Sequence, residues 1–264
     1  MPSRTRTADC VPHHVDRLAP GLIRHSAFIL NRPFQDQAVR FDAMPLKTKR
    51  VPIYMAVLTY LPLLLIGGGL LLAMHAPTPL GATGLFAAWL YLLPPLLGRL
   101  VLLRGVPVCA AAAPTDAAFR RWWLLTQLQM PFNRVAVLEE LLRLVPGLYS
   151  LWLNLWGARV SLMTFWSRDV LISERYLLTI EPGVTVAGQV GLIAHLVAPD
   201  ESGELRLQLA PVVIEAGAML GIRSGLGPGC RVFAGELLPA GRLLPPHTGW
   251  RDGRKVRLPS VEPE

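Results

Sequence analysis

Two histidines and a short cluster of carboxylates are the groups in the C-terminal half of the chain that could move protons. His195 and His247 are the only histidines after residue 159, and Asp200, Glu201 and Glu204 follow His195 closely. An unperturbed imidazole has a pKa of about 6.5, so at neutral pH it is available as a free base. A carboxylate that accepts the second ring N–H can hold such an imidazole in place. The ordinary alternatives are a histidine hydrogen-bonded at a turn and solvated loop acids.

Other residues in the same half could hold a ligand. Glycine lets a ligand approach the backbone closely because it has no Cβ atom, and the chain has such residues at Gly221, Gly225 and Gly227. Arg254 and Lys255 lie in a basic tail, and side chains of this type bind phosphate groups. A solvated or lipid-facing charge run is the alternative for this tail.

The elements that must position these groups follow a period of six residues. Neither an α-helix nor a flat strand has this period, whereas a β-helix with faces about six residues wide turns one side chain inward per face. Glycines fall three residues after most inward positions, where a tight corner often needs positive φ, and Arg223 interrupts the series of glycines. The alternative is a Gly/Pro-rich loop with accidental spacing. The inward positions are Ile214, Leu220, Leu226, Val232, Leu238 and Leu244, and the glycines are Gly217, Gly229, Gly235 and Gly241.

Two earlier runs keep the same spacing. Two extra residues separate these runs, and residues 198–213 interrupt the frame directly after the coil that contains His195. With about 18 residues per coil, residues 160–264 are expected to form a mainly β domain of about four coils with an extruded loop at 198–213 and a basic tail. The inward residues of the earlier runs are Val160, Trp166 and Ile172, then Ile180, Val186 and Leu192.

A long uncharged stretch precedes this domain. No Asp, Glu, Lys or Arg occurs between residues 51 and 98. The stretch divides into two segments, roughly 52–74 and 85–103, and each has the length of about 20 residues that a helix needs to cross a hydrocarbon layer. We expect a transmembrane region of two helices over residues 51–104. A re-entrant hairpin is the alternative.

Basic residues border this region on both outer sides. By the positive-inside tendency, both ends of the region and the C-terminal domain face the cytoplasm, which predicts a multi-pass protein of a bacterial-type inner membrane. The net charge is +8 and the pI is about 10.0. Because the Lys and Arg residues are dispersed around apolar segments, membrane lipids are the expected partner and nucleic acid is not. The bordering residues are Lys47, Lys49 and Arg50 before the region and Arg104, Arg120 and Arg121 after it.

The remaining segments are expected to connect these parts. Residues 1–50 form an N-terminal arm that is basic at its end, and translation could start at Met1 or at Met44. Residues 105–159 form a linker and amphipathic helices. Trp122 and Trp123 beside two arginines are typical of a helix at the headgroup level, with a buried amphipathic helix as the alternative. The three cysteines have neither metal nor disulfide spacing.

The six-residue register, the earlier coils and a histidine just before an extruded loop together resemble the left-handed β-helix acyltransferases, also called hexapeptide-repeat transferases. The stretch at 141–158, LLRLVPGLYSLWLNLWGA, resembles the membrane-associated members, in which helices precede the β-helix. The resemblance covers roughly residues 117–258. It implies a left-handed parallel β-helix preceded by two transmembrane helices and amphipathic helices.

The resemblance also implies a chemistry. In this family an acyl-coenzyme A co-substrate lies in the groove between neighbouring subunits, usually of a homotrimer, and a histidine deprotonates a hydroxyl or amine acceptor. Carried over to this chain, His195 is the general base and His247 is the reserve candidate. The loop acids would wall the acceptor site, the glycines would meet the pantetheine chain, and the tail would hold the phosphates. These residues are Asp200, Glu201 and Glu204, then Gly221, Gly225 and Gly227, then Arg254 and Lys255.

These observations predict a membrane-anchored acyltransferase that transfers an acyl group from coenzyme A to a hydroxyl or amine, on an acceptor that could be lipid-linked. A carbonic-anhydrase type of β-helix would need three histidine ligands, and only two histidines follow residue 159, so no metal is expected. The competing prediction is a non-catalytic β-helix that serves as a scaffold or docking module of a membrane biosynthetic complex.

Overall fold

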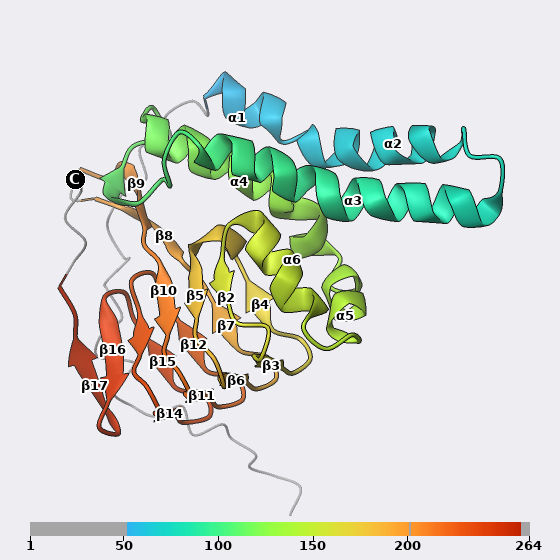
Figure 1. The fold of residues 1–264 in the computed structure, drawn as a ribbon. Helices are drawn as coiled ribbons and strands as arrows, with labels where there is room; N and C mark the ends of the chain where they lie inside the picture. Colours follow the sequence, from blue (N-terminus) through green and yellow to red (C-terminus); the bar gives the residue numbers. More distant parts are fainter. Residues whose placement is uncertain (1–51, 201, 260–264) are drawn as a thin grey trace, which may run out of the picture. The chain divides into compact units, whose positions relative to one another are not determined.

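The computed structural model describes residues 52–200 and 202–259. The predicted N-terminal arm at 1–50, with Met44, lies outside these residues, as does Glu201. Within the described part, helices come first and parallel strands follow (Figure 1). The helices are α1 (Ile53–Leu58), α2 (Leu61–Ala73), α3 (Pro79–Leu102), α4 (Ala117–Arg134), α5 (Val137–Arg143) and α6 (Leu148–Trp156).

Proline and a hydroxyl group set the boundaries within the apolar region. The first predicted apolar helix is divided into α1 and α2, and Pro62 lies in the first turn of α2. A proline ring clashes with the carbonyl group four residues earlier in a continuous helix, so a new helix begins there. Thr78 caps α3 by accepting a hydrogen bond from the Gly81 N–H (3.1 Å). The two segments Ile53–Ala73 and Pro79–Leu102 are long and apolar enough to cross a membrane by length and composition.

The C-terminal part consists of three parallel sheets that the chain visits in rotation. The orders are β17-β16-β13-β10-β5-β2, β14-β11-β6-β3 and β15-β12-β7-β4, and within these three sheets only the β16–β17 pair is antiparallel. Most strands have only two residues, because the chain turns a corner after each one. The bounds are β2 (Arg159–Val160), β3 (Phe165–Trp166), β4 (Leu171–Ile172), β5 (Leu178–Ile180), β6 (Thr185–Val186), β7 (Gly191–Leu192), β10 (Val212–Ile214), β11 (Met219–Leu220), β12 (Gly225–Leu226), β13 (Arg231–Val232), β14 (Leu237–Leu238), β15 (Leu243–Leu244), β16 (Thr248–Arg251) and β17 (Arg254–Arg257).

The predicted aliphatic ladder is confirmed. Residues one coil apart are paired in parallel register, as in Leu192 with Leu226 and Leu226 with Leu244. All six inward positions from Ile214 to Leu244 are at most 2% exposed. Because each strand is too short to be stable alone, burial of this ladder is the main force that holds the coils together.

The corners between strands are left-handed, as the glycine spacing predicted. Gly217, Gly235 and Gly241 all have positive φ. Arg223, which broke the glycine pattern, has the same geometry with φ 58°. Its guanidinium Nε donates to Gln189 Oε1 (2.7 Å), a residue that itself has φ 59° one coil earlier. A non-glycine residue at such a corner costs about 1–2 kcal/mol, and this side-chain contact offsets part of that cost.

A hairpin interrupts the coils at the predicted extruded loop. Its strands are β8 (His195–Pro199) and β9 (Leu205–Leu209), so the excursion begins at His195 rather than at residue 198. Strand β1 (Cys109–Ala112), in the segment expected to be a linker, pairs with β9 and completes a three-stranded sheet. The segment before α4 is therefore fixed to the hairpin that carries His195.

Two glycine-to-alanine substitutions separate backbone strain from steric packing. Gly217 has φ +68° and no neighbour within 4 Å of a built Cβ atom, so Gly217→Ala should cost only the left-handed strain of about 1–2 kcal/mol. At Gly221 a Cβ atom would lie 2.5 Å from the Ala240 backbone nitrogen, so Gly221→Ala should cost about 3 kcal/mol or more. Urea unfolding of both variants in detergent measures the difference, and equal destabilisation would contradict the close stacking of coils.

Candidate functional site

His195 lies against a buried carboxylate where the chain leaves the third sheet. Its Nδ1 atom is 2.6 Å from Oε1 of Glu174. The histidine side chain is 30% exposed, whereas that of Glu174 is 1% exposed. The N–H bond at Nδ1 does not point toward Oε1 of Glu174. The two atoms therefore make a close ion-pair contact and not a linear hydrogen bond. The imidazole thus has its Nδ1 atom buried against the carboxylate, while the side chain as a whole remains partly exposed.

Three further donors hold the Glu174 carboxylate. Trp122 Nε1 on α4 donates to Oε1 (3.0 Å), and the Ala194 N–H donates to Oε2 (3.1 Å). The hydroxyl of Ser173 also donates to Oε2. A buried carboxylate is stable only with such partners, and donors from α4 and from the start of the hairpin fix its position relative to His195.

A buried phenol lies close to the same carboxylate. The side chain of Tyr176 is buried, and no hydrogen-bond partner for its hydroxyl occurs among the described residues. Burial and the negative charge of Glu174 raise its pKa well above the usual value for tyrosine. Tyr176 therefore stays neutral beside the Glu174 carboxylate.

Aromatic side chains of α4 link the site to the first apolar helix. The Trp122 ring packs on the imidazole of His195 with centroids 5.2 Å apart. The adjacent Trp123 donates from Nε1 to the Met55 carbonyl oxygen of α1 (3.3 Å). A short path of direct contacts thus runs from the histidine to the candidate membrane region.

This geometry suits general-base chemistry. The negative charge of Glu174, 2.6 Å from Nδ1, favours the tautomer that is protonated at Nδ1 and leaves the lone pair on Nε2. The same charge stabilises the imidazolium that forms when Nε2 accepts a proton. The arrangement can therefore remove a proton from a hydroxyl or amine that reaches Nε2.

The predicted loop acids are placed elsewhere. Asp200 and Glu204 lie at the turn of the hairpin, at the opposite end of β8 from His195. Asp200 Oδ2 accepts from Arg206 Nε (2.8 Å), and Glu204 lies 3.6 Å from the same guanidinium. Hydrogen bonds from Ser202 and Arg206 lower the pKa of Asp200. These acids order the hairpin turn, and they are not the groups that orient His195.

The orienting carboxylate was not among the predicted site residues, although the sequence carries a signal for it. Two extra residues separate Ile172 from Ile180 in the six-residue frame. Glu174 lies in this insertion, directly before a short 3-10 helix (Arg175–Leu177). A break in a strict repeat displaces side chains from the ladder. Residues at such breaks are therefore candidates for a functional site.

The structure corrects the prediction that glycine backbone N–H groups bind the pantetheine chain of an acyl donor. The N–H groups of Gly221, Gly225 and Gly227 already donate to carbonyl groups of the next coil, at 2.8, 2.9 and 2.9 Å. They are therefore not free to meet a pantetheine chain. At Gly221 and Gly227 a Cβ atom would come close to backbone atoms of the next coil, so packing between coils accounts for these glycines.

The reserve histidine and the tail lie together at the end of the sheets. His247, Lys255 and Arg257 line a surface pocket of about 470 Å³. His247 Nε2 is 2.7 Å from the Gln208 side-chain nitrogen, an uncharged partner in place of the carboxylate that faces His195. Arg254 and Lys255 are exposed on β17. Lys255 thus lines the same pocket as His247, whereas Arg254 is not among the residues that line it.

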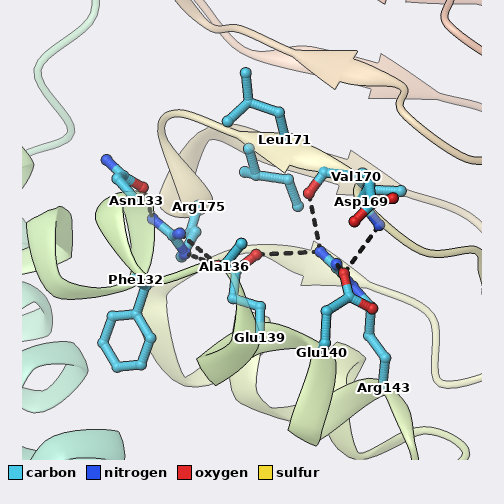
Figure 2. Close-up of a pocket in the computed structure, with 11 residues that line it drawn as sticks. Phe132, Asn133, Ala136, Glu139, Glu140, Arg143, Asp169, Val170, Leu171 and Arg175 are labelled. Carbon is cyan, nitrogen blue, oxygen red and sulfur yellow. Dashed lines mark hydrogen bonds and ion pairs between the residues drawn. The ribbon is translucent and has the colours of Figure 1, made fainter.

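A second charged cluster joins the helices to the first coils (Figure 2). Arg175 is 1% exposed, and its Nε donates to Glu139 Oε1 of α5 (2.7 Å). Arg143 approaches the other oxygen of Glu139 at 3.1 Å and donates to the Val170 carbonyl oxygen (3.0 Å). The cluster borders a small cavity of about 140 Å³. Its charges are matched within the cluster, so its role is to attach α5 to the sheets.

Comparisons with known proteins give only remote similarities. No protein-family model matches the chain, and no curated protein matches it. Among solved structures, a hexapeptide-repeat acetyltransferase from Vibrio cholerae is 14% identical, with 49% of this chain and 85% of that chain covered and a TM-score of 0.27. A maltose O-acetyltransferase from Clostridium difficile is 13% identical, with 58% and 93% covered and a TM-score of 0.25. A serine acetyltransferase from Neisseria gonorrhoeae is 12% identical, with 80% and 81% covered and a TM-score of 0.23.

Removing one member of the buried cluster should strongly destabilise the protein. Arg175→Met leaves the Glu139 carboxylate with one guanidinium fewer in a buried position, which we expect to cost about 3–5 kcal/mol. Arg168→Ala is the control, since that side chain is 83% exposed and its ion pair should contribute less than about 1 kcal/mol. Urea denaturation measures both, and a loss at Arg175 no larger than at Arg168 would contradict the attachment role.

Proposed function

We propose that this chain is a membrane-attached acyltransferase in which His195 acts as general base. The observation that carries the proposal is the Nδ1 atom of His195 lying 2.6 Å from the buried Glu174 carboxylate, on a side chain that is 30% exposed. A structural histidine would not require a desolvated charge fixed by three further donors. A buried carboxylate beside one nitrogen of an imidazole is the arrangement that orients a general-base histidine.

The fold that we infer is a left-handed parallel β-helix. The rotation of the chain through three parallel sheets and the buried six-residue ladder support a β-helix. The handedness rests on the resemblance of the repeat to hexapeptide-repeat transferases. In that family an acyl-coenzyme A co-substrate donates the acyl group, and we propose the same donor here.

The proposed reaction is direct transfer. Nε2 of His195 takes the proton from the acceptor hydroxyl or amine as the acceptor oxygen or nitrogen bonds to the thioester carbonyl carbon. A backbone N–H near the hairpin stabilises the resulting oxyanion. The tetrahedral intermediate then releases coenzyme A thiolate, which recovers the proton from the imidazolium. The acylated acceptor and free coenzyme A are the products.

The donor would lie between copies of the chain. Three of the four outward positions of the sheet β14-β11-β6-β3 are apolar and exposed, with Phe165 at 64%, Met219 at 47% and Leu237 at 57%, and the fourth is the half-buried Thr185. An exposed apolar face of this kind favours association, and the family resemblance favours a homotrimer. Arg254 and Lys255 are exposed at the end of the sheets, where they would hold the phosphates of coenzyme A.

The acceptor would be presented at a membrane. The contacts from His195 through Trp122 and Trp123 to Met55 place the site next to the first apolar helix. We propose that the catalytic part faces the cytoplasm of a bacterial-type inner membrane and that the acceptor is a lipid-linked hydroxyl or amine. A non-catalytic scaffold is the competing proposal, since stacked coils also suit docking.

Substitutions at the histidine and the carboxylate test the catalytic proposal. His195→Ala should lower acyl transfer by about 10²–10⁴-fold, because it removes the base. Glu174→Gln should lower kcat by about 10–100-fold with little change in KM, because it keeps the shape but removes the charge that stabilises the imidazolium. Asp200→Asn, at the far end of the hairpin, should retain activity. Transfer of radiolabelled acetyl groups to membrane lipids measures all three. Full activity of His195→Ala would contradict the general-base role, whereas no transfer by the unsubstituted protein together with no coenzyme A binding would support the scaffold.

Donor binding can be tested without a known acceptor. A ligand that binds only the folded state raises apparent stability by about 2.7 kcal/mol at 100 times its Kd. We therefore expect acetyl-coenzyme A to raise the unfolding temperature in detergent. Arg254→Ala/Lys255→Ala should show a smaller increase if these residues hold the phosphates. No shift with a range of acyl-coenzyme A thioesters would contradict the proposed donor.

A further inference from the structure

We propose that the α2–α3 hairpin and the adjacent outer surface of α5 enter one leaflet of a lipid bilayer without crossing it. The described part of the chain would then be monotopic, with the turn between α2 and α3 inside the hydrocarbon rather than on the far side. This proposal does not depend on acyl transfer, and its test uses no activity measurement.

The hairpin is apolar and largely uncovered. Only 11% and 22% of the two candidate segments are buried within the chain, so they are not core helices of a soluble fold. Their mean hydropathies are 2.1 and 1.7. Leu71 is 64% exposed and Leu80 is 84% exposed, one on each side of the turn. Surfaces of this size and character favour a lipid environment over water.

Only part of the hairpin is free to enter lipid. The second half of α3 is covered by helices of the C-terminal part: Gly98 lies against Trp156 of α6, and Tyr91 donates to the Leu138 carbonyl oxygen (2.8 Å). Trp152 of α6 in turn donates to the Tyr91 carbonyl oxygen (2.9 Å). In Figure 1 the turn and the first half of α3 extend beyond α4 and α6.

The covering helix α4 cannot enter hydrocarbon. Arg120 and Arg134 are exposed near its two ends, so its whole length must remain at the level of water or headgroups. The part of α3 packed on α4 and α6 must remain there too. The free segment of α3, residues 79–89, is about 16 Å long at 1.5 Å per residue, whereas a bilayer core is about 30 Å thick. The hairpin therefore reaches only into one leaflet.

The turn is built to tolerate hydrocarbon. His75 donates from Nδ1 to the Leu71 carbonyl oxygen (2.9 Å), Thr83 donates to the Pro79 carbonyl oxygen (3.0 Å), and Thr78 accepts from Gly81. Each of these polar side chains thus has at least one partner within the hairpin. Such internal bonds lower the cost of moving the turn into hydrocarbon.

The outer surface of α5 continues the apolar surface. Among the exposed residues from 135 to 148 every side chain is apolar, and the charged groups of α5 turn inward to the cluster in Figure 2. Leu144 is 76% exposed. In Figure 1, α5 lies on the side to which the hairpin extends. The exposed residues are Val135, Ala136, Val137, Leu141, Leu144, Val145, Pro146 and Leu148.

Accessibility of single introduced cysteines to a membrane-impermeant maleimide tests the proposal. Ala76→Cys lies in the turn, Leu144→Cys lies just after α5, and Ser202→Cys at the hairpin turn between β8 and β9 is the water-exposed control. Each full-length variant is labelled in sealed inner-membrane vesicles of both orientations and again after detergent solubilisation. The unsubstituted protein, with its three native cysteines, gives the background.

The turn and the α5 surface should behave alike and differ from the control. In vesicles of either orientation, we expect the thiols of Ala76→Cys and Leu144→Cys to be labelled at least tenfold more slowly than the thiol of Ser202→Cys is labelled in the orientation that exposes it. In detergent the three variants should be labelled at similar rates, because solubilisation replaces the bilayer that shields the first two.

The other outcomes would overturn the proposal. Labelling of Ala76→Cys from the side opposite to Ser202→Cys would show two complete spans. Labelling of Ala76→Cys and Leu144→Cys at the rate of Ser202→Cys would show that neither position enters lipid. Protection of Leu144→Cys that persists in detergent and is lost on dilution would show that a second copy of the chain, rather than lipid, covers α5.

Discussion

The inward stacking of one aliphatic side chain per six residues is the constraint on which the rest of the structure depends. Two-residue strands have little stability alone, so the coils exist only while the ladder from Ile214 to Leu244 and its earlier counterparts remain buried. Corners must then turn within a few residues, which forces left-handed backbone at Gly217 and even at Arg223. Any residue that leaves this six-residue frame is displaced from the ladder. The candidate site is formed at two interruptions of the frame, the insertion that contains Glu174 and the hairpin that begins at His195.

Two adjacent residues of that insertion connect the parts of the chain. Glu174 is held by Trp122 of α4 and faces His195, whereas Arg175 is held by Glu139 of α5. Both charges are almost completely desolvated, so each is tolerated only because helices and sheets bring partners to it. The same contacts that support the coils therefore fix the histidine next to helices that pack on the apolar hairpin. This arrangement couples the proposed base to a surface suited to lipid.

The sequence predicted the local features of the fold better than the long-range ones. The ladder and the corners depend on nearest-neighbour spacing, so the sequence alone predicts them, and the break in the frame after Leu192 makes His195 a candidate for the site. Glu174 was missed because its partners lie 52 residues earlier and about 20 residues later, where no periodicity connects them. The sequence pattern predicts that Gly221, Gly225 and Gly227 contact an acyl donor, but the structure shows the next coil packed against them. Close packing by a coil excludes a Cβ atom as strongly as a bound ligand does.

The central claim is that His195, held by Glu174, has a reactive nitrogen at the surface of a coenzyme A site. Carbethoxylation with diethyl pyrocarbonate, followed by peptide mass spectrometry, tests it most directly because the reagent attacks an unprotonated, accessible imidazole nitrogen. Without acetyl-coenzyme A, we expect the reagent to modify His195, and loss of acyl transfer should proceed together with this modification. Saturating acetyl-coenzyme A should prevent the modification of His195. A His195 that resists the reagent, or that is modified equally with and without the thioester, would contradict the central claim.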